Sequence, residues 1–233
     1  MVVDESQRYQ TADLLAAWQS LIGRHSAESG KTDVGRQLLA RWSEPHRRYH
    51  NVTHLRKVLR HVDQLADHAA TPDAVRLAAW YHDAVYTGFS DDEQNSAALA
   101  EKDLADLNVA PALVIEVARL VRLTASHKPD SGDHNGEVLC DADLAVLASA
   151  AQSYAAYAEA IRAEYARVSE KEFRLGRSQV LRSLLDGPAL YRTGPAHARW
   201  EAAARVNLKT ELERLDSTAQ SVQADSRRNQ RCC

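Results

Sequence analysis

The sequence places an adjacent histidine and aspartate, His82 and Asp83, where their side chains could bind a metal ion. They follow residues 75–81, which are apolar almost throughout. Burying a carboxylate there costs on the order of several kcal/mol unless a cation or several hydrogen-bond donors compensate it. A bound metal would provide that compensation. The alternative is that His82 packs in the core while Asp83 caps a neighbouring helix or pairs with an arginine.

Two other segments contain the same kinds of metal ligand. His54 precedes the pair on an amphipathic stretch, and Asp141 and Asp143 interrupt an apolar run that begins at residue 138. Imidazole nitrogens together with carboxylate oxygens suit Mn, Fe, Co, Ni or Zn better than Mg or Ca. An ion held in this way keeps positions for water and lowers the pKa of that water towards ~7. These residues therefore predict a centre that activates water.

Helices must position these side chains. The chain has only 9 glycines and 6 prolines in 233 residues, and no alternating run of β-branched residues indicates a strand. Apolar residues at steps of three and four predict a helix from residue 52, with Asn51 as its N-cap and His54 at the edge of its apolar face. Pro72 begins a second helix, which should be central and buried. The sequence predicts an all-α fold.

Further helices are predicted along the rest of the chain, over residues 11–21, 34–42, 92–107, 111–124, 141–148, 153–168, 169–185 and 195–215. Ser169 and Glu172 form a capping box for one of them. Residues 128–137 are predicted to be a polar loop. We expect one domain over residues 1–215 and a disordered tail over residues 216–233.

Composition excludes several classes of function. A net charge of −3 with both signs interspersed provides no basic field for long nucleic acid. No apolar stretch reaches the ~18 to 20 residues that cross a bilayer, and no signal peptide is evident, so we expect a cytoplasmic protein that does not interact with membranes. The three cysteines, Cys140, Cys232 and Cys233, make a poor disulfide framework.

Four segments in order resemble the HD superfamily of metal-dependent phosphohydrolases, and more narrowly a bacterial branch of predicted HD phosphohydrolases. They are residues 49–54, 80–86, 140–144 and 161–165, and the resemblance runs from about residue 11 to residue 215. It implies a single-domain HD-type helical bundle. It also implies hydrolysis of a phosphate ester, with a nucleotide or another small phosphorylated metabolite as substrate.

The resemblance also implies a role for each ligand. It makes His54, His82, Asp83 and Asp143 the metal ligands. Asp141 is then a helix cap or a residue that supports the ligands without binding the metal itself. The branch often carries an Asn-Glu pair where this chain has Asp92 and Glu93, which leaves the role of that asparagine in doubt.

Other residues are candidates for supporting roles. Asp83 can also orient the nucleophilic water, and Glu93 is the candidate general acid or base, or else a first-turn carboxylate favoured by the helix dipole. For His50 and His127 three roles are open: they could line the site, complete a second metal centre, or be structural. The candidates to bind substrate phosphate are basic residues: Arg162, Arg177 and Lys128.

Two other functions remain open from the sequence. Extra histidines near the motif, His50 and His127, would fit a di-iron oxygenase built on the HD fold. A third hypothesis is a sensor that binds a nucleotide and metal without turnover. The complete ligand set argues against the sensor, and hydrolysis is the leading hypothesis.

Overall fold

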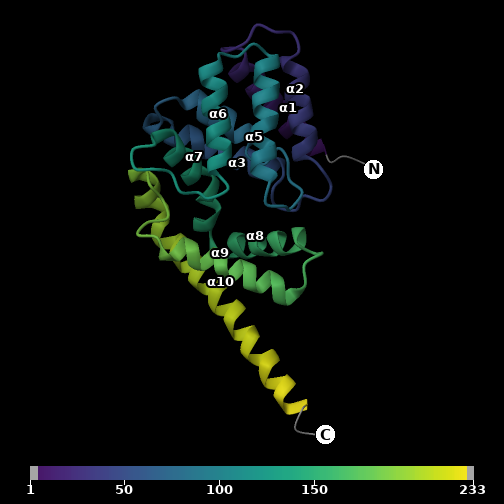
Figure 1. The fold of residues 1–233 in the computed structure, drawn as a ribbon, viewed down its shortest axis with the longest axis vertical. Coiled ribbons are helices and arrows are strands. Elements are labelled where there is room, and N and C mark those ends of the chain that lie inside the picture. Colours follow the sequence, from purple (N-terminus) through teal and green to yellow (C-terminus); the bar gives the residue numbers. More distant parts are fainter. Residues whose placement is uncertain (1–4, 230–233) are drawn as a thin grey trace. The chain divides into compact units, whose positions relative to one another are not determined.

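The structure, a computed structural model, describes the backbone of residues 5–229 and the side chains of residues 12–217. Every regular element in these ranges is a helix, which confirms the predicted all-α fold (Figure 1). Contacts between Cα atoms divide the chain into two compact units, Met1–Asp143 and Leu144–Cys233. The single domain over residues 1–215 stays a prediction.

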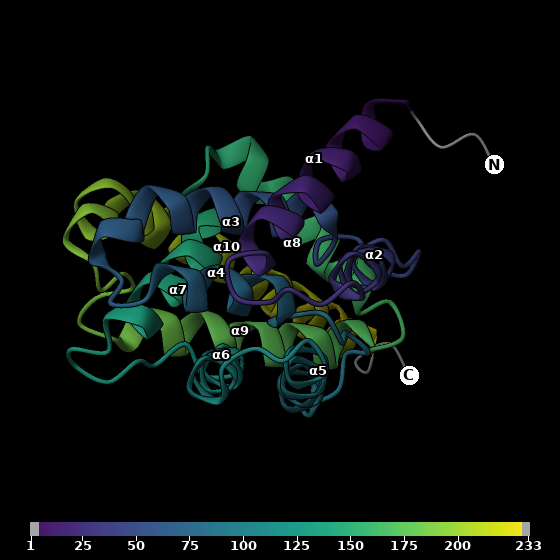
Figure 2. The same ribbon diagram turned by 90° about the horizontal axis from the view of Figure 1, so that it is seen from above.

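The first unit is built around a central buried helix. It contains α1 (Glu5–Ile22), α2 (Lys31–Trp42), α3 (Val52–Leu65), the short 3-10 helix η1 (Ala66–His68), α4 (Pro72–Tyr81), α5 (Asp92–Asp106), α6 (Pro111–Leu123) and α7 (His134–Leu144), whose last residue begins the second unit. Seven of the ten residues of α4 are buried, and α4 contacts α1, α3, α5 and α6. This confirms the predicted central helix. Figure 2 shows α5 and α6 end-on beside each other.

Local signals fix where several of these helices begin. The side chain of Asn51 accepts the N–H of Thr53 at 2.9 Å, so Asn51 is the N-cap of α3 as predicted. Pro72 and Pro111 lie in the first turns of α4 and α6, where an N–H has no partner within the helix. These signals bring His54 into the first turn of α3.

Helix α7 begins earlier than the sequence predicts. It starts at His134 instead of residue 141, so the predicted loop over residues 128–137 ends at Asp133. A carboxylate oxygen of Asp133 accepts the N–H of Gly136 at 3.0 Å and caps the first turn. Asp141 therefore lies inside the helix, fully buried, and the prediction that it could be a helix cap is wrong.

Aromatic side chains pack the core between α1, α2 and α4. The rings of Trp18 and Trp80 lie 5.3 Å apart in an edge-to-face arrangement. The indole of Trp42 donates to the carbonyl of Trp80 at 2.9 Å, and its ring lies 5.4 Å from the ring of His82. The same core therefore holds the end of α4 where the His-Asp pair lies.

The second unit consists of η2 (Ala145–Ala148), α8 (Ala151–Glu164), α9 (Glu170–Asp186) and α10 (Gly194–Asn229). Ser169 and Glu172 form the predicted capping box at the start of α9. Helix α10 continues past residue 215, while residues 230–233 lie outside the described part of the chain. The disordered tail at residues 216–233 stays a prediction. Among the described residues, no helix combines the length and the apolar character needed to cross a membrane.

Candidate metal centre

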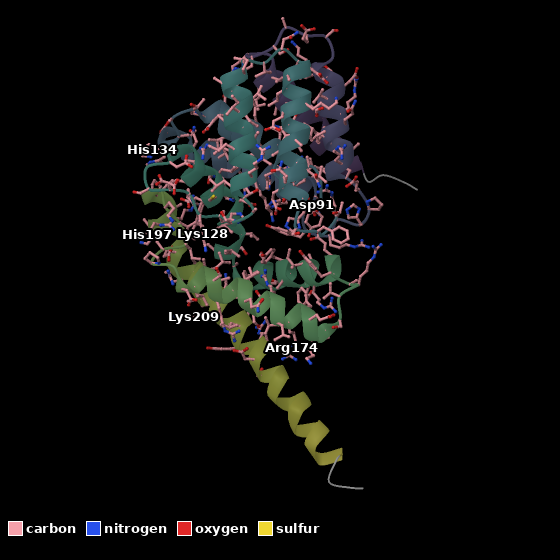
Figure 3. The ribbon with its side chains drawn as sticks, in the orientation of Figure 1. Asp91, Lys128, His134, Arg174, His197 and Lys209 are labelled. Carbon is pink, nitrogen blue, oxygen red and sulfur yellow. The ribbon has the colours of Figure 1, made fainter. Side chains whose placement is uncertain are left out.

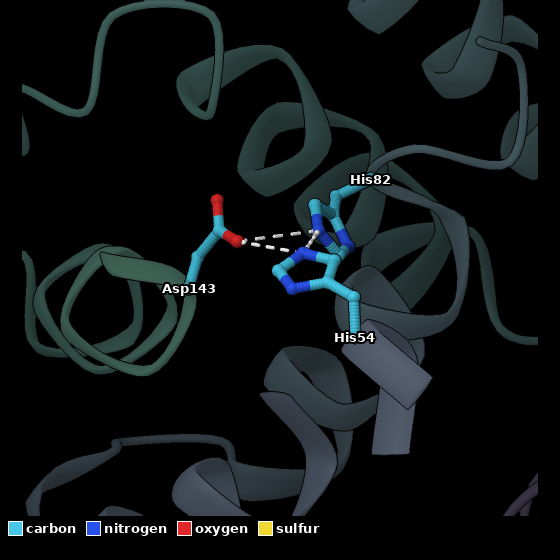
Figure 4. Close-up of side chains that lie close together, drawn as sticks. All are labelled: His54, His82 and Asp143. Atoms are coloured by element: carbon cyan, nitrogen blue, oxygen red, sulfur yellow. Dashed lines mark hydrogen bonds and ion pairs between the residues drawn. The ribbon is translucent and has the colours of Figure 1, made fainter. Parts of the chain in front are cut away.

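Side chains from three helices of the first unit meet at one point (Figure 4). They are His54 in the first turn of α3, His82 at the end of α4 and Asp143 near the end of α7. The two Nε2 atoms lie 3.2 Å apart, and Asp143 Oδ1 lies 3.0 Å from that of His54 and 3.5 Å from that of His82. One ligand atom from each residue is thus within reach of a single ion.

Asp83 adds a second carboxylate to this cluster. Its Oδ2 lies 3.2 Å from His82 Nε2 and 3.7 Å from His54 Nε2. Only 3% and 1% of the His54 and His82 side chains are exposed, against 15% for Asp83. The imidazoles are therefore sealed in the interior, while part of the Asp83 side chain is exposed.

The spacing of these atoms fits a metal centre. Two nitrogen ligands about 2.1 Å from one ion, at angles of about 90 to 109°, are about 3.0 to 3.4 Å apart. The observed separation of 3.2 Å between His54 and His82 lies in that range. Two imidazoles and two carboxylates are also a donor set that transition metals prefer. The residues present therefore fit the ion that the sequence predicts.

A backbone hydrogen bond orients His82 as a ligand. Its Nδ1 lies 2.9 Å from the carbonyl oxygen of Ala79, which can only accept, so Nδ1 carries the proton. Nε2 is then the nitrogen that faces the cluster, and it can bind an ion once it has released its proton. Ligating histidines in metalloproteins have their second nitrogen held in this way.

Burial and the neighbouring charges shift the pKa values of the cluster in opposite directions. Burial lowers the pKa of His54, and the Asp143 carboxylate only partly offsets this effect. For His82, burial acts in the same sense, but Asp83 and Asp143 outweigh it and hold its pKa well above the usual value. Burial raises the pKa of each carboxyl group, yet the His82 charge prevails and lowers the pKa of both Asp83 and Asp143. The carboxylates are therefore ionised and ready to bind a cation.

Both additional histidines lie beside the cluster. His127 Nε2 lies 2.7 Å from Asp143 Oδ2, the oxygen that does not face His54. The ring of His50 lies 5.7 Å from that of His54, and the charge of His50 lowers the pKa of Asp83. The structure therefore brings His50 and His127 to the cluster, whereas Asp141, two residues before Asp143, is not part of it.

The predicted acid or base, Glu93, lies in the first turn of α5 and is half-buried. Burial raises its pKa, and the charge of Asp83 raises it further. Its predecessor Asp92 has a structural role. The Asp92 carboxylate accepts the N–H groups of Thr87, Gly88 and Phe89 and so holds the loop after α4.

The three predicted phosphate ligands have different surroundings. Lys128 is exposed on the first unit, next in the chain to His127 (Figure 3). Arg162 and Arg177 belong to the second unit, where Arg162 pairs with Glu170 at 3.0 Å and Arg177 pairs with Glu211 at 2.8 Å. Arg162 also lines a pocket of about 340 Å³ between α8, α9 and α10. Both arginines thus already have carboxylate partners.

Two residues at the cluster are not predicted by the residue patterns. Trp42 packs on the rings of His54 and His82, and Arg47 is bound to the main chain of Asp83. Trp42 ends a predicted helix and Arg47 precedes the next one, and neither position gives a local signal of such contacts. Their positions follow from long-range packing.

Comparisons with protein-family models, with curated proteins and with solved structures found no match to this chain.

Proposed function

We propose that this protein is a metal-dependent phosphohydrolase that cleaves a phosphate ester of a nucleotide or another small metabolite. The convergence of His54, His82 and Asp143, with Asp83 beside them, supports this proposal. Three of the four segments that resemble HD phosphohydrolases contain these same residues. Mn, Fe, Co, Ni and Zn are the ions that suit the donor set.

Each residue at the cluster has a role in this proposal. His54, His82, Asp83 and Asp143 would hold a divalent metal, which would supply Lewis acidity and lower the pKa of bound water. The Asp83 side chain is partly exposed, and its carboxylate would accept a hydrogen bond from the attacking water and orient it. Glu93 is the candidate general acid or base, and burial raises the pKa of its carboxyl group.

Substrate phosphate needs positive partners as well as a metal. Lys128 is the candidate in the first unit, because it is exposed and follows His127 directly. Arg162 and Arg177 are candidates only if the substrate can compete with Glu170 and Glu211 for their guanidinium groups. Arginine forks suit phosphate oxygens well, so this exchange is chemically reasonable.

A second candidate function is a di-iron oxygenase. The observation that favours it is the 2.7 Å contact between His127 and Oδ2 of Asp143, together with the His50 ring, which lies 5.7 Å from that of His54. These side chains could supply ligands to a second ion. The hydrolase remains the first proposal because it requires only the four ligands of one centre.

Metal analysis of the purified protein is the first test. The second is release of phosphate from a panel of phosphorylated metabolites, without oxygen, after adding Mn, Fe, Co, Ni or Zn to metal-free protein. We expect turnover with several metals, because Lewis acidity and not redox change drives the step. Turnover that requires both iron and oxygen would favour the oxygenase, and bound metal without any turnover would favour a sensor.

Matched variants make this test specific. His82→Ala and Asp83→Ala should each lose most of the metal and nearly all activity. His68→Ala removes an exposed imidazole away from the cluster and should retain both. Full metal occupancy in both cluster variants would contradict the proposed centre.

A further inference from the structure

Arg47 is an arginine whose side chain is completely buried, with 0% exposed. It lies between α2 and α3 and is neither a proposed metal ligand nor a proposed phosphate ligand. Burying a guanidinium is costly unless its N–H groups find acceptors. The identity of these acceptors therefore indicates what Arg47 does.

Three of the four acceptors of Arg47 are main-chain carbonyls. Nη1 donates to the carbonyl of Asp83 at 2.7 Å and to that of His50 at 3.0 Å, and Nη2 donates to the carbonyl of Ala84 at 3.2 Å. Nε donates to the carboxylate of Glu44 at 3.1 Å. One guanidinium thus joins the segment before α3, which carries His50, to the segment after α4, which carries Asp83.

Two aromatic rings fix the orientation of this guanidinium. Its central carbon lies 5.5 Å from the ring centre of Trp42 and 5.4 Å from that of Tyr86. Trp42 also packs against His82, at 5.4 Å between ring centres. Cation–π contacts of a desolvated arginine are stabilising and depend on its planar shape. A lysine could keep the charge but not this combination of contacts.

The charge of Arg47 also lies at a favourable place on the backbone. Helix α4 ends at Tyr81, and the carbonyls that follow its last turn have no partners within the helix. A cation at a helix C-terminus is stabilised by the helix dipole. Arg47 binds the carbonyls of Asp83 and Ala84 at this end, so it holds the chain where the His-Asp pair leaves the helix.

We propose that Arg47 is a positioning residue of the metal centre, which sets where Asp83 and His50 lie by binding both of their main chains. This inference rests on the proposed metal-dependent function. Without Arg47, the donors keep their chemistry, but the Asp83 backbone loses the guanidinium that joins it to the main chain of His50. The metal should then bind more weakly although every ligand is present.

The test measures binding of Mn²⁺ to the metal-free, full-length protein by calorimetry, in the wild type, Arg47→Met and Arg47→Lys. We expect Arg47→Met to bind about 10- to 100-fold more weakly, the usual cost of removing a group that orients metal ligands. Arg47→Lys should lie between Arg47→Met and the wild type. The matched control is Arg119→Lys, which alters the ion pairs with Glu116 and Asp133 away from the cluster and should bind as the wild type does.

Thermal unfolding of each metal-free variant separates positioning from general loss of stability. If Arg47→Met does not fold, Arg47→Lys, which keeps the buried charge, decides the question. Wild-type affinity in folded Arg47 variants would overturn the inference and leave the proposed function intact. An equal loss of affinity in Arg119→Lys would do the same, because the effect would then not be specific to Arg47. Failure of the wild type to bind Mn²⁺ or any other divalent transition metal would overturn both.

Discussion

His127 binds the oxygen of Asp143 that faces away from the other histidines, with 2.7 Å between His127 Nε2 and Asp143 Oδ2. The other oxygen, Oδ1, lies 3.0 Å from His54 Nε2. Asp143 is therefore held from both sides and cannot rotate freely. His127 itself adopts a left-handed backbone with φ of 52°, which is uncommon for a residue other than glycine.

Replacing His127 should weaken metal binding without abolishing it. We expect His127→Asn to bind Mn²⁺ about 10-fold more weakly, because it frees one oxygen of Asp143 but leaves His54 and His82 in place. Asparagine tolerates the left-handed backbone, so the change tests the imidazole. His134→Ala, which removes an exposed histidine, is the control. Unchanged affinity in His127→Asn would mean that Asp143 does not need this partner.

The two aspartates of α7 should differ in their effect on metal binding. Asp143→Ala removes a carboxylate 3.0 Å from His54 Nε2, whereas Asp141→Ala removes a buried group outside the cluster. We therefore expect Asp143→Ala to lose most of the metal and Asp141→Ala to affect mainly folding. Metal content by mass spectrometry and thermal unfolding, measured on the same samples, separate the two effects. If Asp141→Ala lost more metal than Asp143→Ala, Asp141 and not Asp143 would be the ligand.

Asp73 should make the protein sensitive to acid. Hydrogen bonds from Arg24, and further ones from His25 and Arg76, hold the pKa of its carboxyl group well below the usual range. The pKa of this carboxyl group is lower in the folded state than in the unfolded chain, where it is about 3.9. The ionised carboxylate therefore stabilises the fold fully at pH values above about 3.9, and this contribution is lost progressively as the pH falls from there towards the folded-state pKa. We expect Asp73→Asn to cost about 1 kcal/mol at pH 7, a value that allows for solvent screening.

The acid dependence itself provides the check. In urea unfolding at pH 7, 4 and 3, the stability difference between wild type and Asp73→Asn should shrink as the pH falls. Asp33→Asn breaks an exposed pair with Arg36 and should change little at any of these pH values. A difference for Asp73→Asn that stays constant with pH would contradict the prediction.

Two glycines in helices should respond oppositely to alanine. A Cβ at Gly35 would lie 2.3 Å from a ring carbon of the buried Trp18, whereas a Cβ at Gly176 meets nothing within 4 Å. Overpacking costs about 1 to 3 kcal/mol, and alanine stabilises an open helix interior by about 0.5 to 1 kcal/mol relative to glycine. We expect thermal unfolding to show a loss for Gly35→Ala and a gain for Gly176→Ala. Similar midpoints for both variants would contradict the packing around Trp18.

Features with local causes could be predicted from the sequence. The Asn51 cap and the Ser169–Glu172 capping box each involve partners within three residues, and both are present. Pro72 and Pro111 mark helix starts through their own fixed backbone angle. The choice of His54, His82 and Asp143 as ligands comes from the resemblance to HD phosphohydrolases, and these three side chains do lie together.

Features that depend on distant contacts could not be predicted. The early start of α7 requires Gly136, because a side chain there would meet Leu123 of α6 as well as Asp133. The role of Arg47 depends on carbonyls at residues 83 and 84, far along the chain. No periodicity within one segment reports such partners, since they are set only when the helices pack together.

The three donors of the cluster come from separate parts of the chain, and a bound ion would therefore act as a cross-link. Like a disulfide, it would close loops between His54, His82 and Asp143 and remove conformations from the unfolded chain. Unlike a disulfide, this link opens when its histidines gain protons, because only the neutral imidazole binds metal. Acid and chelators would thus have the same effect on the chain: each would lengthen the loops that folding has to close.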